Sequence, residues 1–302
     1  MSMSVLLETN LPLALLHRGK VRDNYELNDQ LLIIATDRIS AFDVVLPCGV
    51  PDKGAVLNLL SAFWFRKTEH LVSNHVIEVV KDTAQLKAYD PKEHDYPSVL
   101  VNRSMIVRKA ERIPIECVVR GYLSGSAWAE YSLRGTINGV AIRPGMKESE
   151  RFPEPIFTPT TKAESGHDQP LTLPEMARLI GSKLTEELKE KTLAVYRFAE
   201  EYARNRDIII ADTKMEFGLV DDKVVLIDEL LTPDSSRFWD VEKYVVGRSQ
   251  PSYDKQMVRD WLTSSGWNKE PPAPMLPEDL IEKTSERYRE VYRILTGSSL
   301  YQ

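Results

Sequence analysis

Three charged residues alternate along one predicted strand, in the stretch IIADTKMEFG. Asp212, Lys214 and Glu216 are two residues apart, so on a strand their side chains share one face. A solvated strand face is the ordinary interpretation of such alternation. The three isoleucines that lead into the stretch favour a strand in the core instead. A buried face with acid, base and acid could bind and neutralise charged reactants.

A second acidic pair, Asp228 and Glu229, ends the strand that returns after this one. A three-residue turn at 221–223 would set Glu216 opposite Asp228, whereas a two-residue turn would set it opposite Ile227. We expect the three-residue turn. Adjacent carboxylates repel each other, which raises one pKa. Mg²⁺ relieves that repulsion and prefers few carboxylates plus phosphate oxygens, so the pair predicts magnesium with a nucleotide.

Near the N-terminus, HRGKVRDNY places Gly19, Lys20 and Arg22 at a predicted hairpin turn. It is not a Walker A loop, which needs GxxxxGK[ST] before a helix. One interpretation is a basic surface turn. The other is a glycine-led lid over a triphosphate, in which Lys20 neutralises charge that moves to the leaving group.

The stretch IPIECVVRGYLSGS brings an arginine to the end of a predicted strand, next to a turn of small residues. Gly121, Ser124, Gly125 and Ser126 would let backbone N–H groups and hydroxyls approach a phosphate. Arg120 can grip a carboxylate or phosphate in a bidentate fork. An ordinary strand-to-helix turn fits this stretch equally well.

Two further segments place basic residues among hydroxyl groups. TPTTKAESGHDQ contains Lys162, His167 and Asp168. His167 taken alone is more often structural or exposed than catalytic. LTPDSSRFWD adds Asp234, Ser235, Ser236 and Arg237. Because one anion rarely needs so many cations, the segments together predict a site for more than one anionic substrate.

The bulk composition limits the class of protein. The 302 residues carry a net charge of −6 and a pI of about 5.6, so no global positive field attracts nucleic acid. Hydrophobic residues at 42% and charged residues at 28% are typical of a globular chain. Cys48 and Cys117 cannot build a disulfide framework, and the sequence shows neither a signal peptide nor about 18 consecutive apolar residues. We expect a cytoplasmic protein that binds neither nucleic acid nor membrane.

The elements that must position these residues are mostly strands in the first third of the chain. The pattern predicts antiparallel strands within 13–46, a helix from Lys53 to about Leu71, and strands in VIEVV and SVLVNRSMIVRKA. A strand and a short helix follow Ile113, where we place a domain boundary. The segment 143–173, rich in Pro, Thr and Gly, is predicted to be a long loop or flap.

The remaining elements are predicted to be mostly helical. Pro174–Arg204 contains the clearest helix, preceded by a short turn or helix, and two more helices are predicted near 253–265 and 278–295. The apolar stripe of the first is formed by Leu184, Leu188, Val195, Phe198 and Tyr202. Between these helices, 207–231 predicts two strands joined by a tight acidic turn.

These motifs resemble the phosphoribosylaminoimidazole-succinocarboxamide synthase, or SAICAR synthetase, family in its longer form. IPIECVVRGYLSGS is similar to the first signature of that family and IIADTKMEFG to the second, and RGKVRD and TPDSSRFWD fit as well. The turn VDDK lacks the glycine often found there. The resemblance covers nearly the whole chain. It implies an α+β fold related to ATP-grasp enzymes, with an antiparallel nucleotide-binding part, 1–113, and a larger substrate- and magnesium-binding part, 114–302, that ends in a helical extension.

The resemblance also implies roles for individual residues. Those implied to bind ATP and its magnesium are Gly19, Lys20, Arg22, Lys162, Glu216 and Asp228. Those implied to bind the imidazole ribonucleotide, chiefly through its phosphate, or to shape its pocket are Asp37, Arg38, Ser40, Asp43, Arg120, Ser126, Ser236 and Arg237. Those implied to line the reaction centre are Lys162, His167, Asp168, Asp212 and Lys214.

The implied reaction condenses a carboxyaminoimidazole ribonucleotide with L-aspartate, using ATP and Mg²⁺. Phosphorylating the carboxylate first creates a good leaving group for the aspartate amine to displace. Asp212 and His167 are both candidates for the base that takes the amine proton. One alternative is a small-molecule kinase, although this sequence contains no HRD-type catalytic loop. The other is a non-catalytic nucleotide-binding module. We expect a monomer or a small homo-oligomer.

Overall fold

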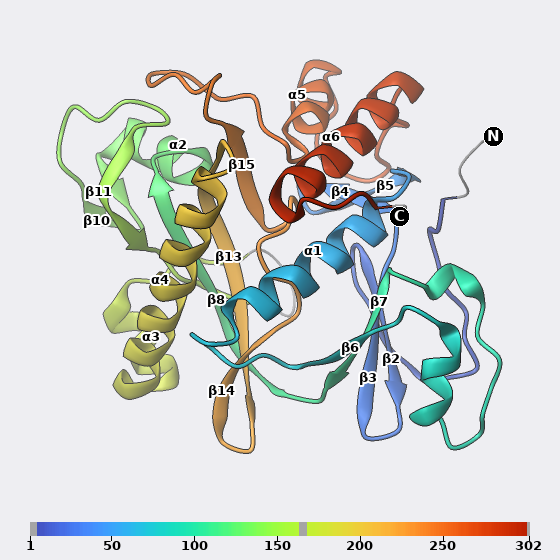
Figure 1. The fold of residues 1–302 in the computed structure, drawn as a ribbon. Helices are drawn as coiled ribbons and strands as arrows, with labels where there is room; N and C mark the ends of the chain where they lie inside the picture. Colours follow the sequence, from blue (N-terminus) through green and yellow to red (C-terminus); the bar gives the residue numbers. More distant parts are fainter. Residues whose placement is uncertain (1–4, 163–167, 301–302) are drawn as a thin grey trace.

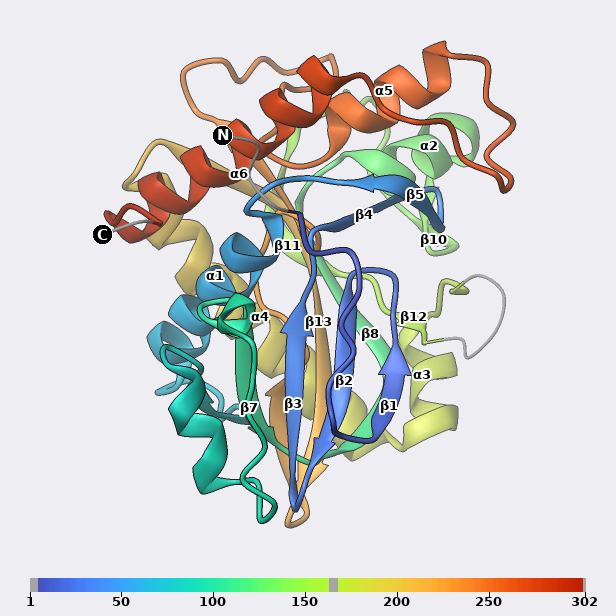
Figure 2. The same ribbon diagram turned by 90° about the vertical axis from the view of Figure 1, so that its right-hand side faces the viewer.

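The computed structural model describes residues 5–162 and 168–300, and its N-terminal part is built on an antiparallel sheet (Figures 1 and 2). The strand order of this sheet is β1-β2-β3-β7-β6. Its strands are β1 (Leu15–Arg18), β2 (Arg22–Leu27), β3 (Gln30–Ala35), β6 (Val76–Val79) and β7 (Ser104–Arg108). A separate ribbon is formed by β4 (Arg38–Ala41) and β5 (Val44–Gly49). The predicted antiparallel opening of the chain is confirmed.

The second sheet is larger and has the order β11-β8-β13-β14, with β12 paired to β8 and β15 paired to β13. Its strands are β8 (Glu111–Tyr122), β11 (Arg151–Phe157), β12 (Thr160–Thr161), β13 (Ile208–Val220), β14 (Lys223–Ile227) and β15 (Ser236–Asp240). The two long strands β8 and β13 pair side by side near the middle of the sheet. Helices and antiparallel strands together make the α+β fold that the resemblance implies.

The helices confirm the predicted positions. They are α1 (Lys53–Thr68), α2 (Gly125–Arg134), α3 (Leu173–Ile180), α4 (Ser182–Arg204), α5 (Gln256–Ser264) and α6 (Glu278–Thr296). A capping box begins α3, in which Thr172 and Glu175 satisfy each other's backbone N–H groups. Glycine at 135 and 297 ends α2 and α6 in the left-handed conformation.

A single core joins the two sheets through helix α1, which is apolar on most sides and therefore buried. Val56, Leu60 and Trp64 of α1 are fully enclosed. The same core includes residues of β3, β13, α4 and α6. Strand β8 begins at Glu111, close to the predicted boundary at Ile113. The division into domains 1–113 and 114–302 stays a prediction, and the shared core crosses it.

One loop prediction and the start of one predicted strand are wrong. The segment 143–173 contains strands β11 and β12, which pair with β8. The prolines in the sequence RFPEPIF are compatible with a strand here because β11 lies at the edge of the sheet, where one side needs no partner. Ser98–Leu100 forms a 3-10 turn, so the strand expected in SVLVNRSMIVRKA begins only at Ser104. In both segments the secondary structure depends on strand pairing that is distant in the sequence.

The predicted register of the acidic hairpin is also wrong. Strand β13 pairs with β14 so that Glu216 lies opposite Ile227, which means a two-residue turn at Asp221 and Asp222. Both aspartates have positive φ, of 50° and 59°, as a primed hairpin turn requires, and aspartate tolerates this conformation better than most residues. The turn therefore closes without the glycine expected there.

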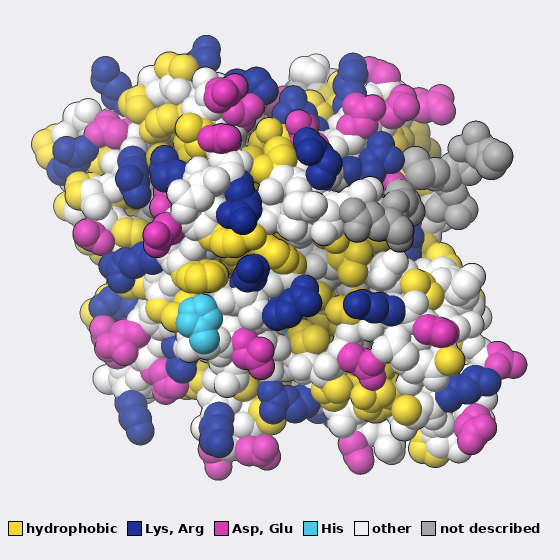
Figure 3. Space-filling model, viewed as in Figure 1, with side chains coloured by type: hydrophobic (Ala, Val, Ile, Leu, Met, Phe, Trp, Pro, Cys, Tyr) yellow, Lys and Arg dark blue, Asp and Glu magenta, His cyan; other side chains and the backbone are white. Residues whose placement is uncertain are grey.

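The surface carries charges of both signs. On the face shown in Figure 3, Lys and Arg side chains alternate with Asp and Glu. Within residues 5–162 and 168–300, no helix combines the length and the apolar character needed to cross a membrane.

Candidate active site

One face of the paired strands β8 and β13 carries buried charges at close range. Glu116 and Glu216 lie directly opposite each other in the register, and both are buried. Lys214 Nζ donates to Glu116 at 2.7 Å, and Lys162 Nζ donates to Glu116 at 2.8 Å and to Glu216 at 2.7 Å. Like charges opposite each other destabilise a sheet, so the two ammonium groups hold the acids together. This face is not a solvated strand face.

The two acids differ in how well their charge is compensated. Burial raises the pKa of Glu116, but Lys214 and Lys162 outweigh it and leave that pKa below its usual value. For Glu216, burial and the nearby Asp228 dominate, so its pKa is raised. Burial opposes the charge of Lys162, yet Glu216 and Glu116 raise the pKa of Lys162. An added cation would therefore be most stabilising beside Glu216.

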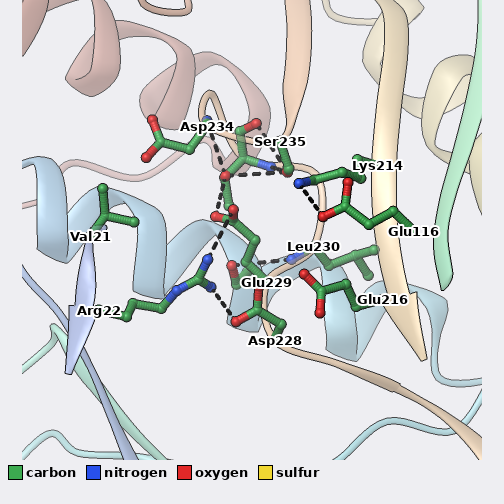
Figure 4. Close-up of polar contacts among 12 residues, drawn as sticks. Val21, Arg22, Glu116, Lys214, Glu216, Asp228, Glu229, Leu230, Asp234 and Ser235 are labelled. Carbon is green, nitrogen blue, oxygen red and sulfur yellow. Dashed lines mark hydrogen bonds and ion pairs between the residues drawn. The ribbon is translucent and has the colours of Figure 1, made fainter. Parts of the chain in front are cut away.

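The end of this face near β14 gathers the predicted magnesium ligands. Figure 4 shows the carboxylates of Glu216 and Asp228 directed into the same space, next to Arg22. Arg22 makes ion pairs of 2.8 Å with Asp228 and 3.1 Å with Glu229. Asp228 lies just after β14 in the left-handed conformation, with φ of 65°. Its carboxylate pairs with Arg22 and lies near enough to Glu216 to raise the pKa of Glu216, although the register sets Glu216 opposite Ile227.

The chemistry of these donors fits magnesium. Mg²⁺ prefers carboxylate and phosphate oxygens and uses only one or two protein carboxylates. Glu216 and Asp228 supply two that repel each other, as the raised pKa of Glu216 indicates. In the part of the chain that the structure describes, no three His, Cys, Asp or Glu residues come together as a metal site. Phosphate oxygens and water would have to complete the coordination.

The opposite end of the face gathers two guanidinium groups around one carboxylate. Arg120 lies 3.3 Å from Asp212 and also donates to Thr158 at 3.0 Å and to Ser126 at 3.2 Å. Arg237 pairs with the same Asp212 oxygen. Two guanidinium groups on one carboxylate leave a net positive charge, which suits a phosphate.

Gly125 is required by the geometry of this end. A Cβ on Gly125 would lie 2.3 Å from Nη2 of Arg237, and its φ of +56° is strained for any residue with a side chain. Gly121 is similar, because a Cβ there would lie 1.9 Å from the hydroxyl of Tyr196. A pocket beside Arg237 is lined by Ser124, Gly125, Trp128, Trp239, Gln250 and Gln256. The two glycines thus make room for the side chains of Tyr196 and Arg237, and the predicted approach of their backbone to a phosphate stays a prediction.

The predicted hairpin turn at Gly19 joins β1 to β2, and Gly19 N–H donates to the carbonyl of Arg22 at 2.8 Å. Lys20 pairs with Asp43 at the surface, 2.5 Å away. Arg38 supports the turn from below: it donates to the carbonyls of Gly19 and Lys20, at 3.0 Å and 3.1 Å. Thus Lys20 lies on the exposed side of the turn, whereas Arg22 points to Asp228.

Several predicted site residues contact protein groups rather than open space. Asp37 is buried and accepts from the backbone N–H groups of Leu6 and Gly54 and from Arg103. Arg38 pairs with Asp23 at 2.7 Å. Their roles in a substrate pocket stay predictions.

The remaining predicted residues are placed as follows. Ser40 is buried in β4, and Ser236 shares a hydrogen bond of 2.7 Å with Thr213. Asp168 is exposed. His167 lies outside the described residues, so its predicted role is untested.

Glu116 is the site residue that sequence reasoning missed. It stands in the stretch PIECVVR, four residues before Arg120, so on a strand both side chains share one face. That alternation was available in the sequence, but an isolated acid among apolar residues gave no reason to pair it with Lys162 and Lys214 from other segments. The contact is long-range.

The fold and the site define an enzyme that handles small anions. It has buried acids for a cation at one end of a sheet face and guanidinium groups for a phosphate at the other. The SAICAR synthetase family model matches residues 15–274. This chain belongs to the SAICAR synthetase family.

The relatives span the whole chain. A phosphoribosylaminoimidazole-succinocarboxamide synthase of Thermodesulfovibrio yellowstonii is 52% identical over 97% of this chain and 99% of its own length. A second such synthase, from Syntrophobacter fumaroxidans, is 48% identical over 99% of this chain and 98% of its own length. A solved Saccharomyces cerevisiae SAICAR synthase, complexed with SAICAR, has a TM-score of 0.89 at 42% identity, covering 98% of this chain and all of that one. The implied class, an ATP-dependent ligase of purine biosynthesis, is confirmed, and the kinase alternative is not favoured.

Proposed function

We propose that this chain condenses carboxyaminoimidazole ribonucleotide with L-aspartate, using ATP and Mg²⁺, and releases SAICAR, ADP and phosphate. The observation that carries the proposal is the arrangement along β13. Glu216 and the neighbouring Asp228 lie at one end, the Asp212 pair with Arg120 and Arg237 lies at the other, and Lys214 lies between them. A phosphate-anchored ribonucleotide would reach along this face toward a nucleotide.

The chemistry needs charge neutralisation at the centre of this face. The carboxylate of the ribonucleotide attacks the γ-phosphorus of ATP and ADP leaves; the aspartate amine then attacks the acyl carbon and phosphate leaves. Glu216 and Asp228 would hold Mg²⁺, which supplies positive charge to the phosphates when bound. Lys214 and Lys162 would neutralise the transferred phosphoryl group once it displaces their carboxylate partners.

The residues at the far end would orient the ribonucleotide and handle the proton. Arg120, Arg237 and Ser126 would bind its phosphate, since their donors converge beside a pocket. The base for the aspartate amine is Asp212 or His167. Asp212 pairs with two guanidinium groups, and a bound phosphate that draws them away would leave its carboxylate free to accept the proton.

The N-terminal part, 1–113, would cover the nucleotide with the Gly19 turn, and 114–302 would bind the ribonucleotide and magnesium. A monomer or small homo-oligomer in the cytoplasm is part of the same proposal, as is the absence of nucleic acid or membrane partners. Arg22 supports this arrangement of the two parts, because it reaches from β2 in the first part to the acids after β14 in the second.

The test is an assay of the purified protein with ATP, Mg²⁺, the ribonucleotide and L-aspartate. We expect SAICAR and ADP in equal amounts, with both lost when aspartate is omitted. ADP release at an undiminished rate without aspartate, together with a phosphorylated product, would favour a kinase. Binding of ATP without turnover under all conditions would favour the non-catalytic module.

A further inference from the structure

One segment connects the two ends of the proposed site. Residues 228–237 run from Asp228, at the magnesium end, to Arg237, at the phosphate end. Within the segment, Thr232 Oγ1 donates to Glu229 at 2.6 Å. The backbone N–H of Lys214 in β13 donates to the carbonyl of Ser235 at 3.0 Å and so ties the segment to the site. The path of this segment therefore sets the spacing between the two ends.

Asp234, in the middle of the segment, is held from three directions. Lys53 Nζ donates to Asp234 Oδ2 at 2.7 Å, and the hydroxyl of Tyr288 donates to Oδ1 at 2.7 Å. Lys255 Nζ lies 3.7 Å from Oδ1. These partners come from the first residue of α1, the middle of α6 and the residue before α5. We call Lys53, Asp234 and Tyr288 the Asp234 clamp.

The Asp234 clamp is enclosed, and its protonation states suit it. Lys53 and Tyr288 are fully buried. Burial alone would raise the pKa of Asp234, but Lys255 and Lys53 hold that pKa below its usual range, so the carboxylate is charged. Burial and the Asp234 charge raise the pKa of Tyr288 well above its usual value, so the phenol keeps its proton and donates. A buried charge with this many partners is costly to disturb.

Among residues 5–162 and 168–300, helix α6 makes no hydrogen bond or ion pair with the charged face of β13, and it lies beyond residues 15–274, which the family model matches. Its link to the site is Tyr288. Packing of α6 on α1 alone does not require that hydroxyl, since both helices already share the apolar core. In the described part of the chain, the Tyr288 hydroxyl hydrogen-bonds only with Asp234 of the 228–237 segment.

We propose that the Asp234 clamp is a positioning device, in which Lys53 and Tyr288 fix Asp234 so that the 228–237 segment keeps the magnesium and phosphate ends at the spacing the reaction needs. The inference rests on the proposed function. It makes α6 part of the working site through one hydroxyl group, and Tyr288 a positioning residue rather than a catalytic one.

The test compares Tyr288→Phe with Tyr292→Phe. Tyr292 lies one turn further along α6 and packs in the same core, so the chemical change and the helix are the same. Among the described residues, the hydroxyl of Tyr288 donates to Asp234, whereas that of Tyr292 makes no hydrogen bond with the 228–237 segment. We expect Tyr288→Phe to raise KM for the ribonucleotide about tenfold, the scale of a buried acceptor that loses its donor, with a smaller fall in kcat. Tyr292→Phe should leave KM at the wild-type value.

Thermal unfolding and calorimetric binding of the ribonucleotide complete the test. Equal KM values for both variants and wild type would overturn the positioning role, as would a loss of stability in Tyr288→Phe with an unchanged dissociation constant. A failure of the proposed function looks different: wild-type protein would then form no SAICAR. The binding measurement would still test the clamp in that case. A weakened affinity of Tyr288→Phe for the ribonucleotide would support the clamp, and an unchanged affinity would contradict it.

Discussion

The exposed hairpin turn at Gly19 and the buried face of β13 both carry opposite charges in contact, but at very different depths. Lys20 and Asp43 have side chains that are 52% and 56% exposed, whereas those of Glu116 and Glu216 are 4% and 10% exposed. Exposed ion pairs contribute little to stability and exchange readily for water or a ligand. Buried charges are costly unless they are paired. The turn can therefore release its lysine freely, while the buried face is held in place.

The depth also separates stability from function. On the buried face, Glu216 keeps a raised pKa, which means that folding disfavours its charge at neutral pH. A buried charge of this kind lowers stability, and the cation proposed to bind there would compensate it. The Lys20 pair carries no such cost.

The largest effect is expected from removing the least compensated acid. Glu216→Ala should lower turnover by at least about a hundredfold, because the carboxylate proposed to hold Mg²⁺ is lost. Its melting temperature should stay equal or rise, because the disfavoured charge is gone. Turnover assays with thermal unfolding check both, and Glu154→Ala, an exposed acid of β11, is the control. Near wild-type activity in a folded Glu216→Ala protein would remove the assignment.

A second effect concerns buried His75 and the dependence of the protein's stability on pH. His75 is buried, and burial together with Arg22 and Arg108 lowers its pKa from 6.5 to about 3. Below pH 6.5 the His75 imidazole binds a proton in the unfolded chain but not in the folded chain. The free energy of unfolding is therefore highest above pH 6.5 and decreases as the pH falls toward 3. Between pH 6.5 and 5 the loss should be about 2 kcal/mol.

Urea unfolding at the two pH values measures this loss. In His75→Gln the part of the pH dependence that belongs to His75 should disappear, whereas His70→Gln, at an exposed position, should keep the wild-type dependence. If His75→Gln and wild type lose the same stability on acidification, the imidazole is not held neutral in the folded protein.

The smallest effect on stability is expected at the exposed turn. Lys20→Ala should change the free energy of unfolding by no more than about 0.5 kcal/mol. It should raise KM for ATP, because a cation near the phosphates is removed. Lys109→Ala is a matched control, since Lys109 makes an equally exposed pair with Glu26 on the same sheet, at 2.6 Å. The same KM for ATP in both variants would place Lys20 outside the nucleotide site.

Much of the fold could be read from local patterns. The helix after Lys53, the paired helices that end at Arg204 and the hairpin at Gly19 follow from apolar periodicity and turn residues, which act over a few positions. The edge strand β11 could not be read this way, because its prolines are tolerated only at an edge that other strands define. The predicted register of the β13–β14 hairpin was wrong because Asp221 and Asp222 both adopt positive φ, a conformation more typical of glycine.

By itself the sequence determined which side chains alternate on each strand, and so placed Asp212, Lys214 and Glu216 on one face. The motifs also determined the family. Only the tertiary structure decided the partners: that Glu116 joins two lysines from different segments, that Arg22 pairs with Asp228 near Glu216, and that Tyr288 of α6 donates to Asp234. Local patterns act along the chain, whereas these contacts depend on how β8, β14 and α6 pack across it.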